Sequence, residues 1–477
     1  MKMDGFRYWW GWWALLIGGI AFALRWRALV GQAFAPGWDG YFYLIQVKAW
    51  VEEGAMHSVD RSPIYLLLRG LSTLTGDYLT AYQLLCALLA GSFAGLSVAL
   101  ARRISGDGWL GLTVGAWCVF SPSLTFFAAQ FPKNLLGMNA LLLLLLFSVR
   151  GPGWAGGLAG IGAFWAHRMT AGLSLIFVVL RQLDGRRMLL VLLLGAVGIG
   201  GASLVPGLLR VADWERFSGA FREMPQLAGW SFVALLDPGR MPPAWIAEIV
   251  LAHLFLLYWV FSWSFARPTA FGWSFAGLCV VLLFPFFEMD VRGMGYRFFL
   301  TFMLLAPQLF AIVPHLFPRE GFHLVTVLLV AGTIWHGGSH RPETFDPDYG
   351  YYQQIVHRAE RVLAGKEPEL IIGHKGLAEL MTFETGIDVL PWQPEYAVDS
   401  SRLWRIAAGI SAMEFRYYLG PADEPRVREL GIDYALLPES VWQRFVAAAT
   451  EEYDADLQAR IREWRNPRQE RPGFLRK

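Results

Sequence analysis

Long apolar segments recur along residues 8–337, and they restrict what this chain can fold into more than any other feature of the sequence. Uncharged runs such as residues 140–147 and 188–194 lie inside these segments. A bilayer offers no water to backbone N–H and C=O groups, so a segment that crosses it must be a helix with internal hydrogen bonds. The chain is 55% hydrophobic and 17% charged. Together these features predict an α-helical polytopic membrane protein.

The positions of the apolar segments predict about eleven spans, since a span needs about 20 apolar residues. The first is the Trp-rich stretch at residues 8–24, which we expect to remain as an anchor because no small-residue cleavage site follows it. The other spans are expected at residues 77–101, 109–128, 134–149, 154–166, 169–180, 188–209, 244–266, 269–287, 298–316 and 321–337.

A change in composition predicts a domain boundary after residue 337. Residues 338–477 hold 18 Lys and Arg and 23 Asp and Glu, whereas the preceding part is apolar and basic. A strand pattern at residues 370–372 followed by a helix pattern at 375–383 is typical of an α/β fold. We therefore expect a transmembrane domain over residues 1–337 and a small α/β domain over residues 338–477.

The distribution of Lys and Arg predicts the orientation. Short loops on the cytoplasmic side of a membrane protein carry an excess of these residues. Arg102, Arg103 and Arg150 fall in one alternating set of loops, and acids such as Asp39 and Asp60 fall in the other. We expect a cytoplasmic N-terminus and an extracytoplasmic C-terminal domain in a prokaryotic plasma membrane, with membrane lipid and no nucleic acid among the partners.

Residues 38–65 are too polar to cross a bilayer and rich in aromatic side chains. Phe42, Ile45 and Ala49 follow a helical period, which predicts a helix lying in the membrane interface. Gly54 can end it, because glycine accepts the left-handed conformation after a helix. A second short helix is expected at residues 62–75. Asp39 precedes the first helix and Asp60 follows it, and ionisable groups beside a bundle of spans indicate a functional site.

This layout resembles the GT-C superfamily of membrane glycosyltransferases, which includes protein mannosyltransferases and aminoarabinose transferases. The likeness rests on an Arg near the end of the first span and on motifs in two loops. These residues are Arg25 or Arg27, Asp39, Tyr41, Tyr43, Glu53-Gly54, Asp60-Arg61-Ser62-Pro63 and the RGMGYR motif at 292–297. The resemblance implies transfer of a sugar from a polyprenyl-phosphate donor, and it implies the C-terminal domain on the outer side.

Two carboxylates are candidates for the chemistry. The acid that matches Asp39 in the superfamily is catalytic or binds a metal, so we expect Asp39 to act as the general base on the acceptor. The alternative is that Asp39 only caps the following helix. Asp60 is a second candidate that would orient the acceptor or the base, or else it simply starts the next helix ahead of Pro63.

Basic residues are candidates for binding the donor phosphate, because guanidinium groups hold phosphate oxygens well. Arg292 and Arg297 flank Tyr296, with pairing to nearby acids as the alternative. Charge inside an apolar hairpin is costly, so His167 and Arg168 indicate a pocket or an interhelical pair. Further candidates of the same type are Arg61 and Lys133, and Lys133 could equally be an interfacial anchor.

No cofactor is evident from the sequence. A divalent metal in the superfamily uses acids of a second outer loop, whereas the matching loop at residues 130–134 has none. This departure argues against a metal-dependent site. Cys86, Cys118 and Cys279 lie in apolar segments and are expected to be buried hydrophobic residues.

The leading hypothesis is an inverting glycosyltransferase that moves a hexosyl or pentosyl group to a protein, glycan or lipid acceptor on the outer side of the membrane. A transporter or flippase of a lipid-linked sugar is one alternative, and it would place ionisable residues deep inside spans. A non-catalytic membrane scaffold is the other, and it would tolerate the loss of Asp39.

Overall fold

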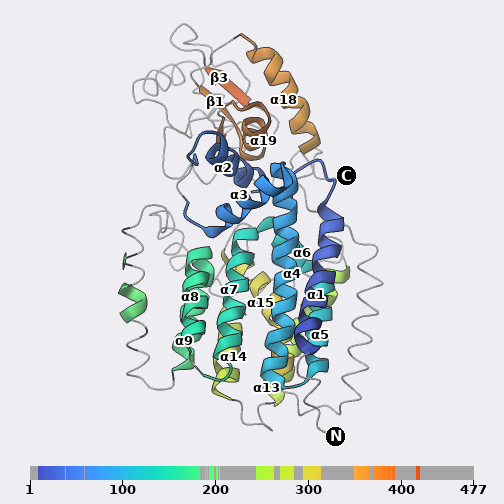
Figure 1. Cartoon of the computed structure of the whole chain (residues 1–477), viewed down its shortest axis with the longest axis vertical. Coiled ribbons are helices and arrows are strands. Elements are labelled where there is room, and N and C mark those ends of the chain that lie inside the picture. Colours follow the sequence, from blue (N-terminus) through green and yellow to red (C-terminus); the bar gives the residue numbers. More distant parts are fainter. Residues whose placement is uncertain are drawn as a thin grey trace, which may run out of the picture. The chain divides into compact units, whose positions relative to one another are not determined.

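The computed structural model of this chain is predominantly α-helical (Figure 1). It describes residues 9–182 except 38, 58–59 and 152, scattered helical positions between 189 and 204, and residues 243–262, 269–283, 294–312, 349–365, 370–392 except 388, and 415–418. Among these residues, two helices are long and apolar enough to cross a membrane, and a bent helix pair can count as a third. These helices agree with the prediction of an α-helical membrane protein.

The chain divides into two compact units. The first, the helical unit, comprises Met1–Gly37 and Ser58–Thr344. Its helices are α1 Trp9–Leu29, α3 Pro63–Thr75, α4 Tyr78–Ser105, α5 Gly108–Phe120, α6 Pro122–Gln130, α7 Pro132–Ser148, α8 Trp154–Ala166, α9 Arg168–Arg181, α13 Pro243–Ser262, α14 Ala270–Leu283, α15 Met294–Leu305 and α16 Pro307–Ile312.

Helices α1 and α4 pack against each other in antiparallel directions. The Gln83 side chain at the start of α4 donates a hydrogen bond to the carbonyl of Gln32, just after α1 ends. In the middle of the pair, a Cβ atom added to Gly91 would lie 2.7 Å from the carbonyl oxygen of Gly18. Small residues at such a contact let two helix backbones approach closely, which is a common basis of helix association in membranes.

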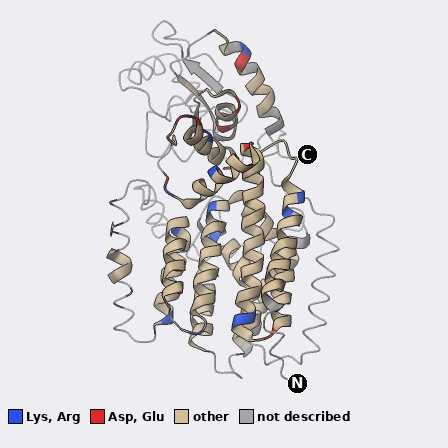
Figure 2. Cartoon of the chain, viewed as in Figure 1, with Lys and Arg blue, Asp and Glu red and all other residues tan. Residues whose placement is uncertain are grey.

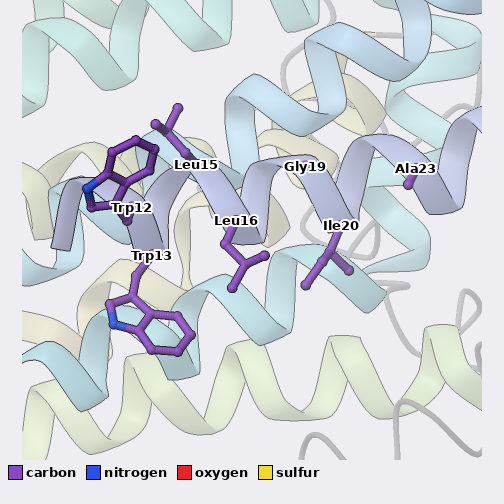
Figure 3. A pocket seen from close by; sticks show the side chains of 7 residues that line it. All are labelled: Trp12, Trp13, Leu15, Leu16, Gly19, Ile20 and Ala23. Atoms are coloured by element: carbon purple, nitrogen blue, oxygen red, sulfur yellow. The ribbon is translucent and has the colours of Figure 1, made fainter. Parts of the chain in front are cut away.

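The opposite face of α1 is exposed and apolar. Trp12, Leu15 and Ile20 point away from the helix and line a shallow groove together with their neighbours on α1 (Figure 3). A helix face of this composition is suited to contact with lipid tails. The first helix therefore offers glycines to the bundle and large apolar side chains to the other side.

The helical unit carries its charges at two ends, and the middle of the helices is almost uncharged (Figure 2). At one end, α4 finishes with Arg102 and Arg103, and the Arg181 guanidinium at the end of α9 donates to the Ser148 carbonyl at the end of α7. At the other end, the Trp165 indole of α8 donates to the Arg61 carbonyl. The charges of the helical unit thus fall into two separated groups, and the orientation predicted from the loop charges stays a prediction.

Three expected spans have different boundaries in the structure. Helix α1 continues to Leu29, so Arg25 lies inside the helix instead of at its end. The segment expected as one span at 109–128 is two helices, α5 and α6, which meet at an angle of 56°. The span expected at 298–316 is interrupted between α15 and α16. Both breaks precede a proline, Pro122 or Pro307, which lacks an N–H group and clashes with the preceding turn.

The second unit, the sheet unit, comprises Trp38–His57 and Phe345–Lys477. It contains a three-stranded sheet in which β1 pairs in parallel with β2 and antiparallel with β3. The strand and helix expected at 370–372 and 375–383 are present as β1 and α19. Its elements are α2 Gly40–Glu52, α18 Tyr349–Leu363, β1 Leu370–His374, α19 Lys375–Thr385, β2 Leu390–Trp392 and β3 Phe415–Tyr418.

Helix α2 belongs to the sheet unit, whereas the sequence analysis placed residues 38–57 in the transmembrane domain over residues 1–337. The Lys48 ammonium donates a 2.8 Å hydrogen bond to the Phe383 carbonyl on α19, and the Tyr41 and Phe383 rings lie 5.5 Å apart. Contacts between segments this distant in sequence have no local signature. Residues on more than one face of α2 are buried, so α2 does not show the single buried face expected of an interfacial helix.

Two other predictions concern residues that the structure does not describe. The span expected at 321–337 lies outside the described residues, and most of the span expected at 188–209 does as well. The C-terminal α/β domain over 338–477 is described only in part, so this domain assignment remains a prediction.

Candidate functional site

An ion pair joins Asp60 to Lys133 at one end of the helical unit. The Lys133 Nζ lies 2.5 Å from the Asp60 Oδ2, and the two side chains are 16% and 10% exposed. The other carboxylate oxygen, Oδ1, accepts a 2.9 Å hydrogen bond from the Ser62 N–H. Because Ser62 is the N-cap residue of α3, Asp60 satisfies a backbone donor at the start of that helix. Asp60 therefore binds the start of α3, as the structural alternative predicted, and it also forms an ion pair with Lys133.

The segment that contains Asp60 is attached to the corner between α8 and α9. The Ser62 hydroxyl donates to the Ala166 carbonyl at 2.9 Å, and the Trp165 indole donates to the Arg61 carbonyl at 2.6 Å. The Arg61 side chain is exposed. These bonds connect the backbone of residues 61 and 62 to α8. The predicted role of the Arg61 side chain in phosphate binding stays a prediction.

His167 forms the corner between α8 and α9 and caps α9. Its Nδ1 accepts a 3.1 Å hydrogen bond from the Met169 N–H, which requires an unprotonated Nδ1. Burial lowers the pKa of His167 well below its ordinary value, and the positive charges of Lys133, Arg297 and Arg168 lower it further. His167 is therefore neutral, and its remaining ring nitrogen carries the proton.

The corner is held against α7 by a close contact. The Thr170 Oγ1 lies 2.7 Å from the His167 carbonyl oxygen and 3.0 Å from the Ala163 carbonyl oxygen. A Cβ atom added to Gly137 would lie 2.1 Å from the Thr170 Oγ1. Only a glycine on α7 leaves room for this arrangement, and it brings the start of α9 close to the start of α7.

Arg297 completes the group from a third direction. Its guanidinium lies over the Phe131 ring, 4.7 Å from the ring centroid, which is a cation–π geometry. Phe131 ends α6 and precedes α7, so the contact joins α15 to the residues beside Lys133. We call Lys133, Arg168 and Arg297, together with neutral His167, the cationic cluster. Arg292 lies outside the described residues, as does the side chain of Tyr296.

Several helices begin at the cationic cluster. Helix α3 starts next to Asp60, α7 starts with Lys133 in its first turn, and α9 starts at Arg168. The N-terminus of a helix carries partial positive charge and N–H groups without an intrahelical partner. In the first turn of α7, the side-chain amide nitrogen of Asn134 is buried and has no hydrogen-bond partner among the described residues. This end of the bundle is therefore suited to bind an anion.

A second polar group lies at the break between α5 and α6. The Arg25 guanidinium donates to the carbonyls of Val119 and Cys118, both at 2.9 Å. Glu248 on α13 accepts hydrogen bonds from the Ser121 hydroxyl and from the hydroxyl and N–H of Ser123. Both charged residues are buried, at 3% and 5% exposure. Arg25 thus binds the backbone at the end of α5, and Glu248 binds the residues at the start of α6.

The sequence analysis did not identify this second group. Glu248 is an acid within the expected span 244–266, and an intramembrane acid indicates a structural or functional partner by default. Arg25 was assigned to the end of a span, although it contacts residues more than 90 positions later. The dipeptide Ser121-Pro122 is a helix-start signal, because serine caps and proline suits the first helical position.

Asp39 belongs to the sheet unit and stands at the N-cap position of α2. Its carbonyl accepts the Tyr43 N–H at 3.2 Å, but its side chain forms no capping hydrogen bond with α2. The structure therefore does not show the capping role that was the alternative to catalysis. Asp39 and the cationic cluster lie in different units.

Among the described residues, no group of three or more His, Cys, Asp or Glu side chains is arranged to hold a metal ion. Cys86, Cys118 and Cys279 are buried free thiols, as predicted. No protein-family model matches the chain, and no curated protein matches it either.

Proposed function

We propose that this chain is an inverting glycosyltransferase that moves a sugar from a polyprenyl-phosphate donor to an acceptor on the outer side of the membrane. The observation that carries the proposal is the cationic cluster. Lys133, Arg168 and Arg297 gather where three helices begin, at one end of a bundle whose middle is apolar. A ligand with an anionic headgroup and a long apolar tail fits such an arrangement, because the headgroup would lie at the cationic cluster and the tail along the apolar part of the helices.

The chemistry of the transfer explains the need for cations. The acceptor oxygen or nitrogen attacks the anomeric carbon, and the bond between that carbon and the phosphate oxygen breaks. The electron pair of this bond leaves with the phosphate, so negative charge grows on the polyprenyl phosphate during the step. Fixed positive groups aimed at developing charge stabilise the transition state more than the ground state.

A general base must remove the proton from the acceptor, and Asp39 is our candidate for this role. Its support is the superfamily resemblance, in which the matching acid opens the first outer loop. Asp60 would orient the acceptor as the second acid. Neutral His167 can donate its ring N–H to the phosphate or the sugar.

The wider layout is part of the same proposal. About eleven spans would surround the donor tail, and the α/β domain would lie outside the membrane and help to bind a protein, glycan or lipid acceptor. An inner membrane with a cytoplasmic N-terminus would be the location. A divalent metal is not required by this chemistry, because the cationic cluster can neutralise the phosphate.

The test uses purified protein in lipid nanodiscs with a panel of polyprenyl-phosphate sugars, and it measures release of polyprenyl phosphate. Wild-type protein should turn over one donor, and Asp39→Asn should reduce the rate by about a thousandfold, as loss of a general base does. Asp107→Asn is the matched control, because Asp107 caps α5 through its side chain. Full turnover by Asp39→Asn would refute the assignment, and a chelator arm would determine whether a metal takes part.

A transporter of lipid-linked sugars is a second candidate. It is favoured by the buried charges of Arg25 and Glu248, which lie inside helices, as the transporter hypothesis requires. The two side chains are engaged with a helix break, which supports a structural role instead. Vesicles that contain the protein and a labelled lipid-linked sugar would show headgroup movement across the bilayer without any release of polyprenyl phosphate if transport were the function.

A further inference from the structure

The Asp60 carboxylate occupies the position in which a ligand anion would be expected. Lys133 is the cation paired with it, and the Lys133 Nζ lies 2.5 Å from the Asp60 Oδ2. The remaining charged members of the cationic cluster are positive. A carboxylate that holds one member of a cation group competes with any incoming anion for that member.

We propose that Asp60 is an internal counter-ion of the cationic cluster and is exchanged for the phosphate of the lipid ligand. In the ligand-free state Asp60 holds Lys133. When the phosphate binds, the Lys133 N–H groups move from the carboxylate oxygen to a phosphate oxygen, and no covalent bond changes. This inference rests on the proposed function, because it assumes that the cluster binds a polyprenyl phosphate.

The surroundings of Asp60 suit an exchange of this kind. Only Oδ2 faces Lys133, whereas Oδ1 accepts the Ser62 N–H. The bond to Ser62 keeps Asp60 in place when Lys133 leaves, because Ser62 is itself bonded to Ala166. Lys133 is the more mobile partner, since its charge lies at the end of a long flexible chain. The exchange thus requires one lysine side chain to move and leaves the loop unchanged.

The exchange gives Asp60 a part in product release. A sugar-linked polyprenyl phosphate is a diester with one negative charge, whereas the product is a monoester whose second ionisation occurs near pH 6. The product would therefore bind three cations more tightly than the donor does. Return of Lys133 to Asp60 would weaken that binding and help the product to leave.

The experiment measures binding of farnesyl phosphate, a short polyprenyl monophosphate, to the full chain in nanodiscs. Farnesol tests the contribution of the tail alone, and inorganic phosphate tests the headgroup alone. Asp60→Asn removes the charge but keeps an oxygen for the Ser62 N–H. Removal of the competitor should strengthen binding by about tenfold, which corresponds to 1.4 kcal/mol. In the transfer assay, the same variant should show stronger inhibition by the product.

The controls separate competition from a general charge effect. Asp77→Asn is the matched variant, because Asp77 caps α4 through the Thr80 N–H and has no ion-pair partner among the described residues. This variant should bind farnesyl phosphate like the wild type. In a Lys133→Gln background, Asp60→Asn should no longer strengthen binding, because the two residues act through one contact.

Each outcome has a separate meaning. If Asp60→Asn bound farnesyl phosphate with the same affinity as the wild type, or more weakly, the exchange would be overturned and the proposed function would stand. Equal strengthening by Asp77→Asn would also overturn it. Failure of farnesyl phosphate to bind any of these proteins would contradict the proposed function and the exchange together.

Discussion

The pair of buried charges at the α5–α6 break allows a prediction of stability. Glu248→Gln keeps the size of the side chain but removes its charge and replaces one acceptor oxygen with a donor group. In the wild type, Oε1 accepts from Ser121, and Oε2 accepts from the N–H and the hydroxyl of Ser123. A backbone N–H cannot bond to the new amide nitrogen, so at least one of the two acceptor positions is impaired. The Arg25 charge also loses its counter-charge.

The magnitude follows from these losses. Arg25 and Glu248 attract each other without a direct ion pair, so the loss comes mainly from hydrogen bonds to the carboxylate, each of which contributes about 1.5–3 kcal/mol. Because Gln retains one carbonyl acceptor and Arg25 keeps its backbone carbonyl partners, we expect a loss of about 2–3 kcal/mol. Arg25→Met should cost a similar amount. The double variant should be more stable than the sum of the two losses indicates, by about 1–3 kcal/mol.

The three cysteines provide the assay. All of them are buried, so a brief pulse of a thiol-reactive dye labels only unfolded protein. Protein in mixed micelles is equilibrated across a series of SDS concentrations, and labelling gives the free energy of unfolding. Glu53→Gln, the same substitution at an exposed position, should leave it unchanged. A Glu248→Gln midpoint equal to that of the wild type, or additive losses in the double variant, would refute the pairing of Arg25 with Glu248.

Two further predictions concern the corner between α8 and α9. Gly137→Ala would place a methyl group against the Thr170 hydroxyl and should destabilise the protein by about 1–3 kcal/mol in the same titration. Gly172→Ala, where a Cβ meets open space, should be neutral or stabilise the protein by up to about 1 kcal/mol, because alanine favours the helix more than glycine does. The lowered pKa of His167 means that the unfolded chain binds a proton that the folded chain does not, so stability should fall as the pH drops below about 6.5. His167→Asn keeps a capping oxygen for the Met169 N–H and should remove this part of the pH dependence, and an unchanged pH profile would contradict the neutral assignment.

The sequence predicted helices well and the contacts between them poorly. Apolar length determines where a span can form, and α4 and α7 follow the expected segments closely. The bend before Pro122 and the break before Pro307 were missed because apolar composition continues through both of them. Proline and a preceding serine were the local signals that could have located the first of these breaks.

The sequence analysis predicted individual residues of the candidate site, but it did not predict which of them contact one another. Lys133 and Asp60 were both proposed as site residues, but their pairing spans 73 positions and depends on how α7 meets α3. His167 was predicted to line a pocket or to form an interhelical pair, and the contact that the structure shows for its ring is the capping bond to α9. Glu248 was not predicted as a site residue. In the sequence, Ser121 and Ser123 look like ordinary helix-start residues, and only the packing of α13 beside them brings Glu248 into contact.

The burial of Arg25 has a consequence for biosynthesis. Ribosomes deliver Arg25 of α1 before Val119, which accepts a hydrogen bond from Arg25 and emerges 94 residues later. An unpaired arginine in hydrocarbon costs about 2.5–3.5 kcal/mol on insertion scales. During that interval α1 has to keep its guanidinium at the headgroups or stay beside the translocon. We therefore expect α1 to reach its final position in the bundle only after α5 and α6 have been made.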